Sequence, residues 1–182
     1  MPILTAVRAD ITEQRVDAIV NAANNRMRGG GGVDGAIHRA AGPELLRECI
    51  ARFPDGLATG DAGWTPAGRL PASWVIHTVG PNHAAGERDR ALLESCYRRA
   101  LEVADQLGVR TMAFPLISAG VYGWPRADAI SAAVETIAGT PTRVAEVRLV
   151  AFSDDVLRHM RAIMLTRFPR GDRQDAPADG HS

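Results

Sequence analysis

Apolar and polar residues follow two different spacings along the chain, and each spacing predicts one kind of element. The clearest helix covers 88–107, where Leu92, Cys96, Ala100 and Val103 recur at three- and four-residue steps. Further helices are expected at 33–41, 43–52, 126–138 and 154–168. Short apolar runs predict strands at 3–7, 16–21, 62–65, 75–79, 111–116 and 146–152.

Strands and helices that alternate through short loops are typical of a single α/β domain. The chain has 182 residues, enough for one domain with a sizeable core, and we assign residues 1–168 to that domain. The segment 169–182 is polar and carries proline and glycine, so we expect a disordered tail. In open α/β sheets, ligands bind outside the carboxyl ends of the strands. The candidate binding loops therefore follow the strands that end near Asn21, Val79, Leu116 and Phe152.

Composition narrows the possible functions. The formal net charge is zero and aromatic residues make up 5% of the chain, so a nucleic-acid partner is not expected. No apolar run approaches the roughly 18–20 residues of a membrane helix, and the first residues lack the pattern of a secretory signal. The two cysteines, Cys49 and Cys96, do not suggest a disulfide framework, so we expect the reducing environment of the cytoplasm. It has no lysine, which excludes a Walker A loop and Schiff-base catalysis.

The segment from Asn21 to Gly42 carries the strongest functional signal. It places Asn21, Asn24, four glycines at 29–32 and Asp34 just before a predicted helix. Glycine amides can approach a ligand closely, and a helix N-terminus attracts anions, so the segment predicts a phosphate-binding loop. A flexible loop is the alternative for the glycines, and an Asx-turn is the alternative for each asparagine. Because a carboxylate and a phosphate repel each other, we expect Asp34 to act on a part of the ligand that lies beside the phosphates.

The same segment also matches the dinucleotide-binding fingerprint G-x-G-x-x-G, from Gly30 to Gly35. In that fingerprint the glycines follow the strand directly, whereas eight residues separate Asn21 from Gly30. The acidic ribose ligand should lie about twenty residues further on, at the end of a second strand. Asp55 has nearly that spacing but lies in a predicted turn, so this interpretation is disfavoured.

A second loop rich in small residues follows the predicted strand 111–116. It contains Ser118, Ala119, Gly120, Val121 and Tyr122, and Pro125 suits the first turn of the next helix. Two such loops at neighbouring strand ends can hold a diphosphate from both sides. Tyr122 either covers a ligand or packs against its own loop.

Asp10, Phe152 and two histidines are further candidates for ligand binding. Asp10 either accepts a hydrogen bond from an exocyclic amine such as that of adenine or caps a helical turn. Phe152 either stacks on a base or belongs to the core. His77 and His83 flank a predicted turn, and no cysteine lies near them at zinc spacing, so no metal or cofactor is expected.

Taken together, these motifs resemble the signature of the MacroD-type macrodomains. The matching blocks occur in the family's order and cover about residues 3–168. They are DIT at 10–12, NAAN at 21–24, GGGG at 29–32, VDG at 33–35, IH at 37–38, TGDA at 59–62, IHTVGP at 76–81 and SAGVYG at 118–123.

The resemblance implies a three-layer α/β/α sandwich with a mixed central sheet and a cleft for ADP-ribose. It implies an enzyme that removes mono-ADP-ribose from Asp and Glu side chains of proteins and deacetylates O-acetyl-ADP-ribose. ADP-ribose and ADP-ribosylated proteins are then the expected partners of a monomer, and a non-catalytic ADP-ribose reader is the alternative.

The resemblance also implies roles for individual residues. Asp10 and the Ile11 backbone bind adenine, and Phe152 covers it. Asn24 binds the distal ribose, Tyr122 packs against it, and Asp34 activates or positions the attacking water, unless a substrate diphosphate oxygen holds that water. Asn21, which stands close to the glycine loop, is a further candidate for ligand binding from the residue pattern alone. The diphosphate is held by Gly30, Gly31, Gly32, Val33, Ser118, Ala119, Gly120, Val121 and Tyr122.

The chain departs from the family pattern at Arg26 and Arg28, which make the stretch 25–28 more basic than is usual there. This change either extends contact with acidic substrates or has no effect. Trp124 replaces a more common Tyr or Phe, and the Cys/His ligand set of the zinc-bearing relatives is missing.

Overall fold

The computed structural model describes residues 1–169, so nearly all of the predicted tail, 170–182, lies outside the described residues. The predicted elements are all present, with ends shifted by at most two residues. The strands are β1 (Ile3–Arg8), β2 (Ala18–Ala23), β3 (Ala62–Pro66), β4 (Trp74–Val79), β5 (Thr111–Phe114) and β6 (Glu146–Ala151). The helices are α1 (Gly32–Ala41), α2 (Pro43–Arg52), α3 (Arg90–Leu107), α4 (Arg126–Gly139) and α5 (Asp154–Arg167), with short 3-10 helices η1 (Ile11–Glu13) and η2 (His83–Ala85).

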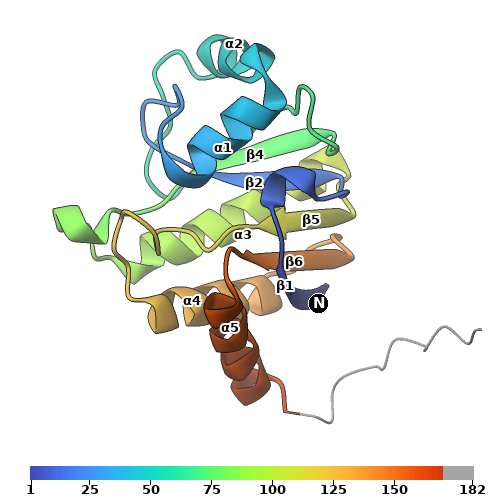
Figure 1. Cartoon of the computed structure of the whole chain (residues 1–182), viewed down its shortest axis with the longest axis vertical. Coiled ribbons are helices and arrows are strands. Elements are labelled where there is room, and N and C mark those ends of the chain that lie inside the picture. The colour runs from blue at the N-terminus through green and yellow to red at the C-terminus, as the bar shows by residue number, and fades with distance from the viewer. Residues whose placement is uncertain (170–182) are drawn as a thin grey trace, which may run out of the picture.

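The six strands form one mixed sheet in the order β1-β6-β5-β2-β4-β3. In Figure 1 the labelled strands follow one another downward from β4 to β1, with α1 and α2 above them and α5 below. All neighbouring pairs are parallel except β3 and β4, which are antiparallel. The carboxyl ends of five strands therefore meet at one edge of the sheet. This is the edge at which the sequence predicted ligand binding.

Alternate residues of each strand point to opposite faces of the sheet and divide the core into layers. Ile19 and Val75 pack with Ile37 and Leu45 of α1 and α2, whereas Val20 and its neighbours on that face pack with α3 and α4. The three-layer α/β/α sandwich with a mixed sheet is thus confirmed. No helix within residues 1–169 is long and apolar enough to cross a membrane.

Two strand ends differ from the prediction in ways that matter for the site. β5 ends at Phe114 rather than at residue 116, because Pro115 has no amide to continue the ladder. β2 runs two residues past the predicted end, so Asn21 lies inside the sheet, directly opposite His77 of β4. Asn21 is therefore a core residue rather than a loop residue.

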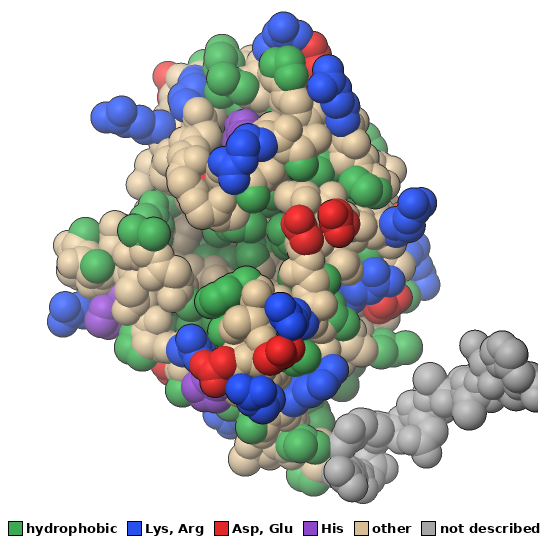
Figure 2. Space-filling view, viewed as in Figure 1, with side chains coloured by type: hydrophobic (Ala, Val, Ile, Leu, Met, Phe, Trp, Pro, Cys, Tyr) green, Lys and Arg blue, Asp and Glu red, His purple; other side chains and the backbone are tan. Residues whose placement is uncertain are grey.

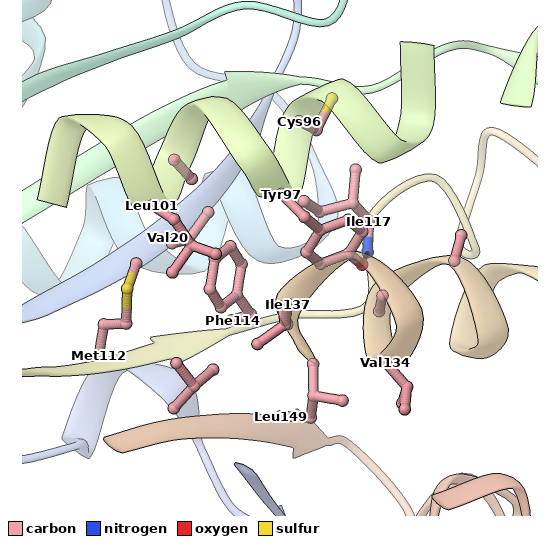
Figure 3. Close-up of a cluster of buried hydrophobic side chains, with 14 of the residues drawn as sticks. Val20, Cys96, Tyr97, Leu101, Met112, Phe114, Ile117, Val134, Ile137 and Leu149 are labelled. Carbon is pink, nitrogen blue, oxygen red and sulfur yellow. Dashed lines mark hydrogen bonds between the residues drawn. The ribbon is translucent and has the colours of Figure 1, made fainter. Parts of the chain in front are cut away.

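Tyr97 of α3 joins the larger core to the second binding loop. Its ring is fully buried against Phe114, and its hydroxyl accepts a hydrogen bond of 3.0 Å from the amide of Ile117 (Figure 3). Burial raises the pKa of this phenol well above its usual range. A neutral hydroxyl from the core thus fixes the start of the loop that follows β5.

Candidate functional site

A cavity of about 1160 Å³ opens at the carboxyl edge of the sheet. Figure 2 shows this face hollowed near its middle, with hydrophobic side chains on the floor. Fourteen of the fifteen predicted site residues line this single cavity. They are Asp10, Ile11, Asn24, Gly30, Gly31, Gly32, Val33, Asp34, Ser118, Ala119, Gly120, Val121, Tyr122 and Phe152.

The first glycine-rich loop ends at the N-terminus of α1, on the wall of the cavity. Gly31 precedes the helix, and no side chain caps this end. Gly32 has φ +58°, a conformation that glycine adopts without strain. The first amides of α1 are therefore available to an anionic ligand.

Asp34 lies in the first turn of α1 and is 4% exposed. Its Oδ1 accepts a hydrogen bond of 2.7 Å from Asn21 Nδ2 and lies 3.4 Å from His38 Nε2. Asn21 itself is fully buried and does not line the cavity, whereas the sequence predicted it as a ligand residue. The reason is the strand register, which turns Asn21 toward α1. Its amide holds Asp34 from behind.

The other oxygen of Asp34 lies near Asn24, across Gly30. A Cβ atom built on Gly30 would lie 3.2 Å from both Asp34 Oδ2 and Asn24 Nδ2. Asn24 also accepts from the amide of Arg26 at 3.1 Å, so the Asx-turn interpretation holds for Asn24 while its side chain still reaches the cavity. The absence of a side chain at Gly30 therefore leaves space between one carboxylate oxygen and one carboxamide.

The second loop places Ser118 and Tyr122 on the opposite wall. Ser118 has φ +65° and is 7% exposed, and its Oγ has no hydrogen-bond partner among residues 1–169. Gly80 packs against it so closely that a Cβ there would lie 2.2 Å from Ser118 Oγ. Gly80 lines the cavity and was missed by the sequence analysis, although its place directly after β4 was a usable signal.

Tyr122, also in the second loop, is half-buried. Burial, then the charges of Glu87 and Asp34, raise the pKa of Tyr122. Its carbonyl accepts a hydrogen bond of 2.9 Å from Ala84 of η2. The loop is thus held by its backbone, and the ring remains on the cavity wall.

The far end of the cavity is more exposed. Asp10 Oδ1 accepts hydrogen bonds from the amide and hydroxyl of Thr12 at 2.9 and 2.7 Å, so Asp10 does cap η1. Phe152 is 80% exposed, which excludes the core interpretation and leaves its ring at the mouth of the cavity. Arg8 and Arg126 also line this end and pair with Asp154 and Asp155, respectively.

Arg28 contributes to the fold rather than to this cavity. Its guanidinium donates to the carbonyl oxygens of Cys49, Phe53 and Pro54 at 3.0–3.4 Å, at the C-terminus of α2. A cation at this end bonds to the last carbonyls of the helix and is favoured by the helix dipole. Trp124, the other departure noted in the sequence, is buried and donates to Asp128 at 2.9 Å.

Comparison with known proteins agrees with this geometry. The family model described as "Macro domain" matches residues 20–133. A protein named O-acetyl-ADP-ribose deacetylase from Salmonella typhimurium is 50% identical over 170 residues, covering 90% of this chain and 94% of that protein.

Two solved structures are also similar. The Oceanobacillus iheyensis macrodomain with ADP is 38% identical with a TM-score of 0.85, covering 89% of this chain and 90% of that one. The Trypanosoma brucei macrodomain in complex with ADP-ribose is 41% identical with a TM-score of 0.80, covering 88% of this chain and 68% of that one. The chain therefore belongs to the macrodomain family.

Proposed function

We propose that this protein binds ADP-ribose and hydrolyses esters at its distal ribose. The substrates are O-acetyl-ADP-ribose and mono-ADP-ribose joined to Asp or Glu side chains of proteins. The names of the similar proteins support the ligand and the deacetylase activity. The observation that carries hydrolysis is the setting of Asp34 on the cavity wall. Asn21 holds one carboxylate oxygen from inside the protein, and Gly30 leaves open space between the other oxygen and the Asn24 amide.

The proposed chemistry assigns one task to each part of the cavity. The amides at the start of α1 and the backbone of 118–122 hold the diphosphate, since both walls offer glycine-rich loops. Asn24 binds a ribose hydroxyl, and Tyr122 packs on the ribose. Asp10 and Ile11 bind adenine, and Phe152 covers it.

Hydrolysis then adds water across the ester between the acyl carbon and the ribose oxygen. Asp34 Oδ2 orients the attacking water or accepts its proton, and the ribose oxygen leaves as a hydroxyl. Positioned acid–base help of this kind contributes about 10²–10⁴-fold in rate. A carboxylate held by Asn21 in one orientation suits either role, because the attacking atom must be aligned with the acyl carbon.

Replacing Asp34 tests this proposal. We expect Asp34→Ala to reduce ester hydrolysis by at least about a hundredfold while ADP-ribose still binds. Calorimetry with ADP-ribose, together with release assays on O-acetyl-ADP-ribose and a Glu-modified protein, measures both effects. Asp55→Ala is the matched control, because Asp55 is exposed, lies in a turn and is outside the cavity.

Full activity of Asp34→Ala would overturn the assignment of Asp34. Tight ADP-ribose binding by the wild type with no cleavage of either ester would instead indicate a reader module.

A further inference from the structure

Behind Asp34, a chain of buried polar side chains runs through three neighbouring strands. Asn21 of β2, His77 of β4 and Thr65 of β3 are each 0% exposed, although most of their neighbours are apolar. Thr65 Oγ1 lies 2.9 Å from His77 Nε2, and His77 Nδ1 lies 3.1 Å from Asn21 Nδ2. Asn21 then reaches Asp34. Burying polar side chains is costly unless they are hydrogen-bonded, and here each side chain pairs with the next. Such a buried series of contacts leading to Asp34 calls for an explanation.

The chemistry of the paired groups assigns the proton positions along this series of contacts. The carboxylate of Asp34 only accepts hydrogen bonds, so Asn21 must present its NH₂ group to it. The same nitrogen faces His77 Nδ1, which must therefore be the unprotonated ring nitrogen. A neutral ring then carries its proton on Nε2 and donates it to Thr65 Oγ1. Burial supports the neutral ring, because desolvation lowers the pKa of His77 to about 3, with a smaller contribution from the charge of His38.

His77 supports the orientation of the Asn21 amide that Asp34 requires. The carboxylate needs the NH₂ group, and His77 Nδ1 accepts the second hydrogen of that group. If the amide turned over, its oxygen would face the Asp34 carboxylate, and both groups are acceptors. The two contacts together hold the Asn21 amide in one orientation.

We propose that His77 is a positioning residue for the hydrolytic reaction, acting on Asp34 through Asn21. The inference rests on the proposed function, in which Asp34 Oδ2 acts on the attacking water. By holding Asn21, His77 gives this oxygen a defined direction. Asp34 contacts the substrate side; His77 lies behind it and does not line the cavity. Loss of His77 frees Asn21 to rotate and lets the carboxylate move, and a displacement of about 1 Å can reduce a rate by about 10²-fold.

Two substitutions of His77 separate positioning from packing. His77→Leu fills a similar volume but removes the acceptor for Asn21. His77→Asn is smaller, yet its side-chain oxygen occupies the position of Nδ1 and restores that acceptor. We expect kcat for O-acetyl-ADP-ribose to fall between about tenfold and a hundredfold in His77→Leu and to recover most of that loss in His77→Asn. KM and the Kd for ADP-ribose stay within about threefold of wild type in both, because neither side chain touches the ligand side.

Thr78→Val is the matched control. Thr78 is the next residue of β4 and is also fully buried, but its hydroxyl donates to the carbonyl of Asp61, away from Asn21. The substitution removes a buried hydroxyl from the same strand but leaves the contacts that run from Thr65 to Asp34 in place. Its kcat should equal that of wild type.

A double-mutant cycle tests whether His77 acts through Asp34. In the Asp34→Ala background, His77→Leu should cause no further loss of the residual turnover. Multiplied losses, or wild-type kcat in His77→Leu, would overturn the positioning role. Either result is distinct from failure of the proposed function, which appears as absent wild-type turnover or an active Asp34→Ala variant.

A measurement on the unmutated protein keeps the inference testable if His77→Leu does not fold. The ¹⁵N shifts of the His77 ring distinguish the two neutral tautomers. A proton on Nε2 with a bare Nδ1 supports the proposal, whereas a proton on Nδ1 contradicts it.

Discussion

Two carboxylates line the same cavity, and their surroundings are opposite. Asp34 is 4% exposed, and the neutral amide of Asn21 holds one of its oxygens from inside the protein. Asp10 is exposed, and within residues 1–169 its carboxylate is held by Thr12, two residues along the chain. Asp34 thus depends on contacts from distant parts of the sequence, whereas Asp10 is positioned by its own turn.

The difference indicates different uses of the same chemical group. A carboxylate fixed by buried partners keeps its orientation, which suits the alignment of a reacting atom. A carboxylate on a local turn still offers an acceptor at a defined place, which suits recognition of an amine. We therefore expect substitutions at the Asp34 end to lower kcat and substitutions at the Asp10 end to weaken binding.

The largest effect is expected from a charge placed between the two ends. Gly31→Glu adds a carboxylate where Gly31 lines the cavity, and no atom outside its immediate neighbours lies within 4 Å of the new Cβ. Repulsion of the diphosphate should abolish ADP-ribose binding in calorimetry. Gly139→Glu, at the end of α4 and equally unobstructed, is the control and should bind as wild type. Unchanged affinity in Gly31→Glu would remove the first loop from the site.

The next effect concerns the buried histidine behind Asp34. Because the pKa of His77 is lowered from 6.5 to about 3, the unfolded chain binds a proton in this range that the folded protein does not. Stability should therefore rise with pH through this window and fall as pH decreases. Relative to His77→Asn, wild type should lose about 2 kcal/mol of unfolding free energy between pH 7 and pH 5, at about 1.4 kcal/mol per unit below 6.5.

Urea titrations of both proteins at the two pH values measure this difference, since all other titrating groups are shared. An equal pH dependence in the two proteins would show that His77 is not held neutral.

A smaller effect is expected at the Asp10 end. Asp10→Asn keeps an oxygen to cap η1 but replaces the free acceptor with a donor. Loss of a hydrogen bond to a charged group should raise the Kd for ADP-ribose about tenfold, with kcat unchanged at saturation. Asp89→Asn, a similar cap at the start of α3 and outside the cavity, is the control. A fall in kcat with unchanged KM would erase the contrast between the two ends.

The smallest effect on substrate binding and turnover is expected for a contact that belongs to neither end of the cavity. Tyr97→Phe removes the hydroxyl that receives the Ile117 amide and leaves that buried donor unpaired. We expect a loss of about 1–3 kcal/mol in unfolding free energy, with a modest rise in KM because the second loop is less well held. Denaturant unfolding measures the first quantity and steady-state kinetics the second. No change in stability would show that the amide finds another partner.

Much of this protein follows from its sequence alone. Periodicity predicts each strand and helix within two residues, since apolar spacing reflects which face of an element is buried. The same reasoning places the binding loops after the strands, and one edge of the sheet does collect them. Glycine runs and the carboxylate at Asp34 are local signals, so they could be recognised without knowing the fold.

Only the tertiary structure decided how Asn21, His77 and Arg28 are used. A shift of two residues in the end of β2 turns Asn21 from a loop ligand into a buried partner of Asp34. His77 looked like a residue beside a turn, yet strand register places it opposite Asn21, 56 positions away in the chain. Arg28 looked available to substrates but caps α2. The physical reason is common to all three: a polar side chain inside a protein is defined by its hydrogen-bond partner, and these partners come from elements that only the folded sheet brings together.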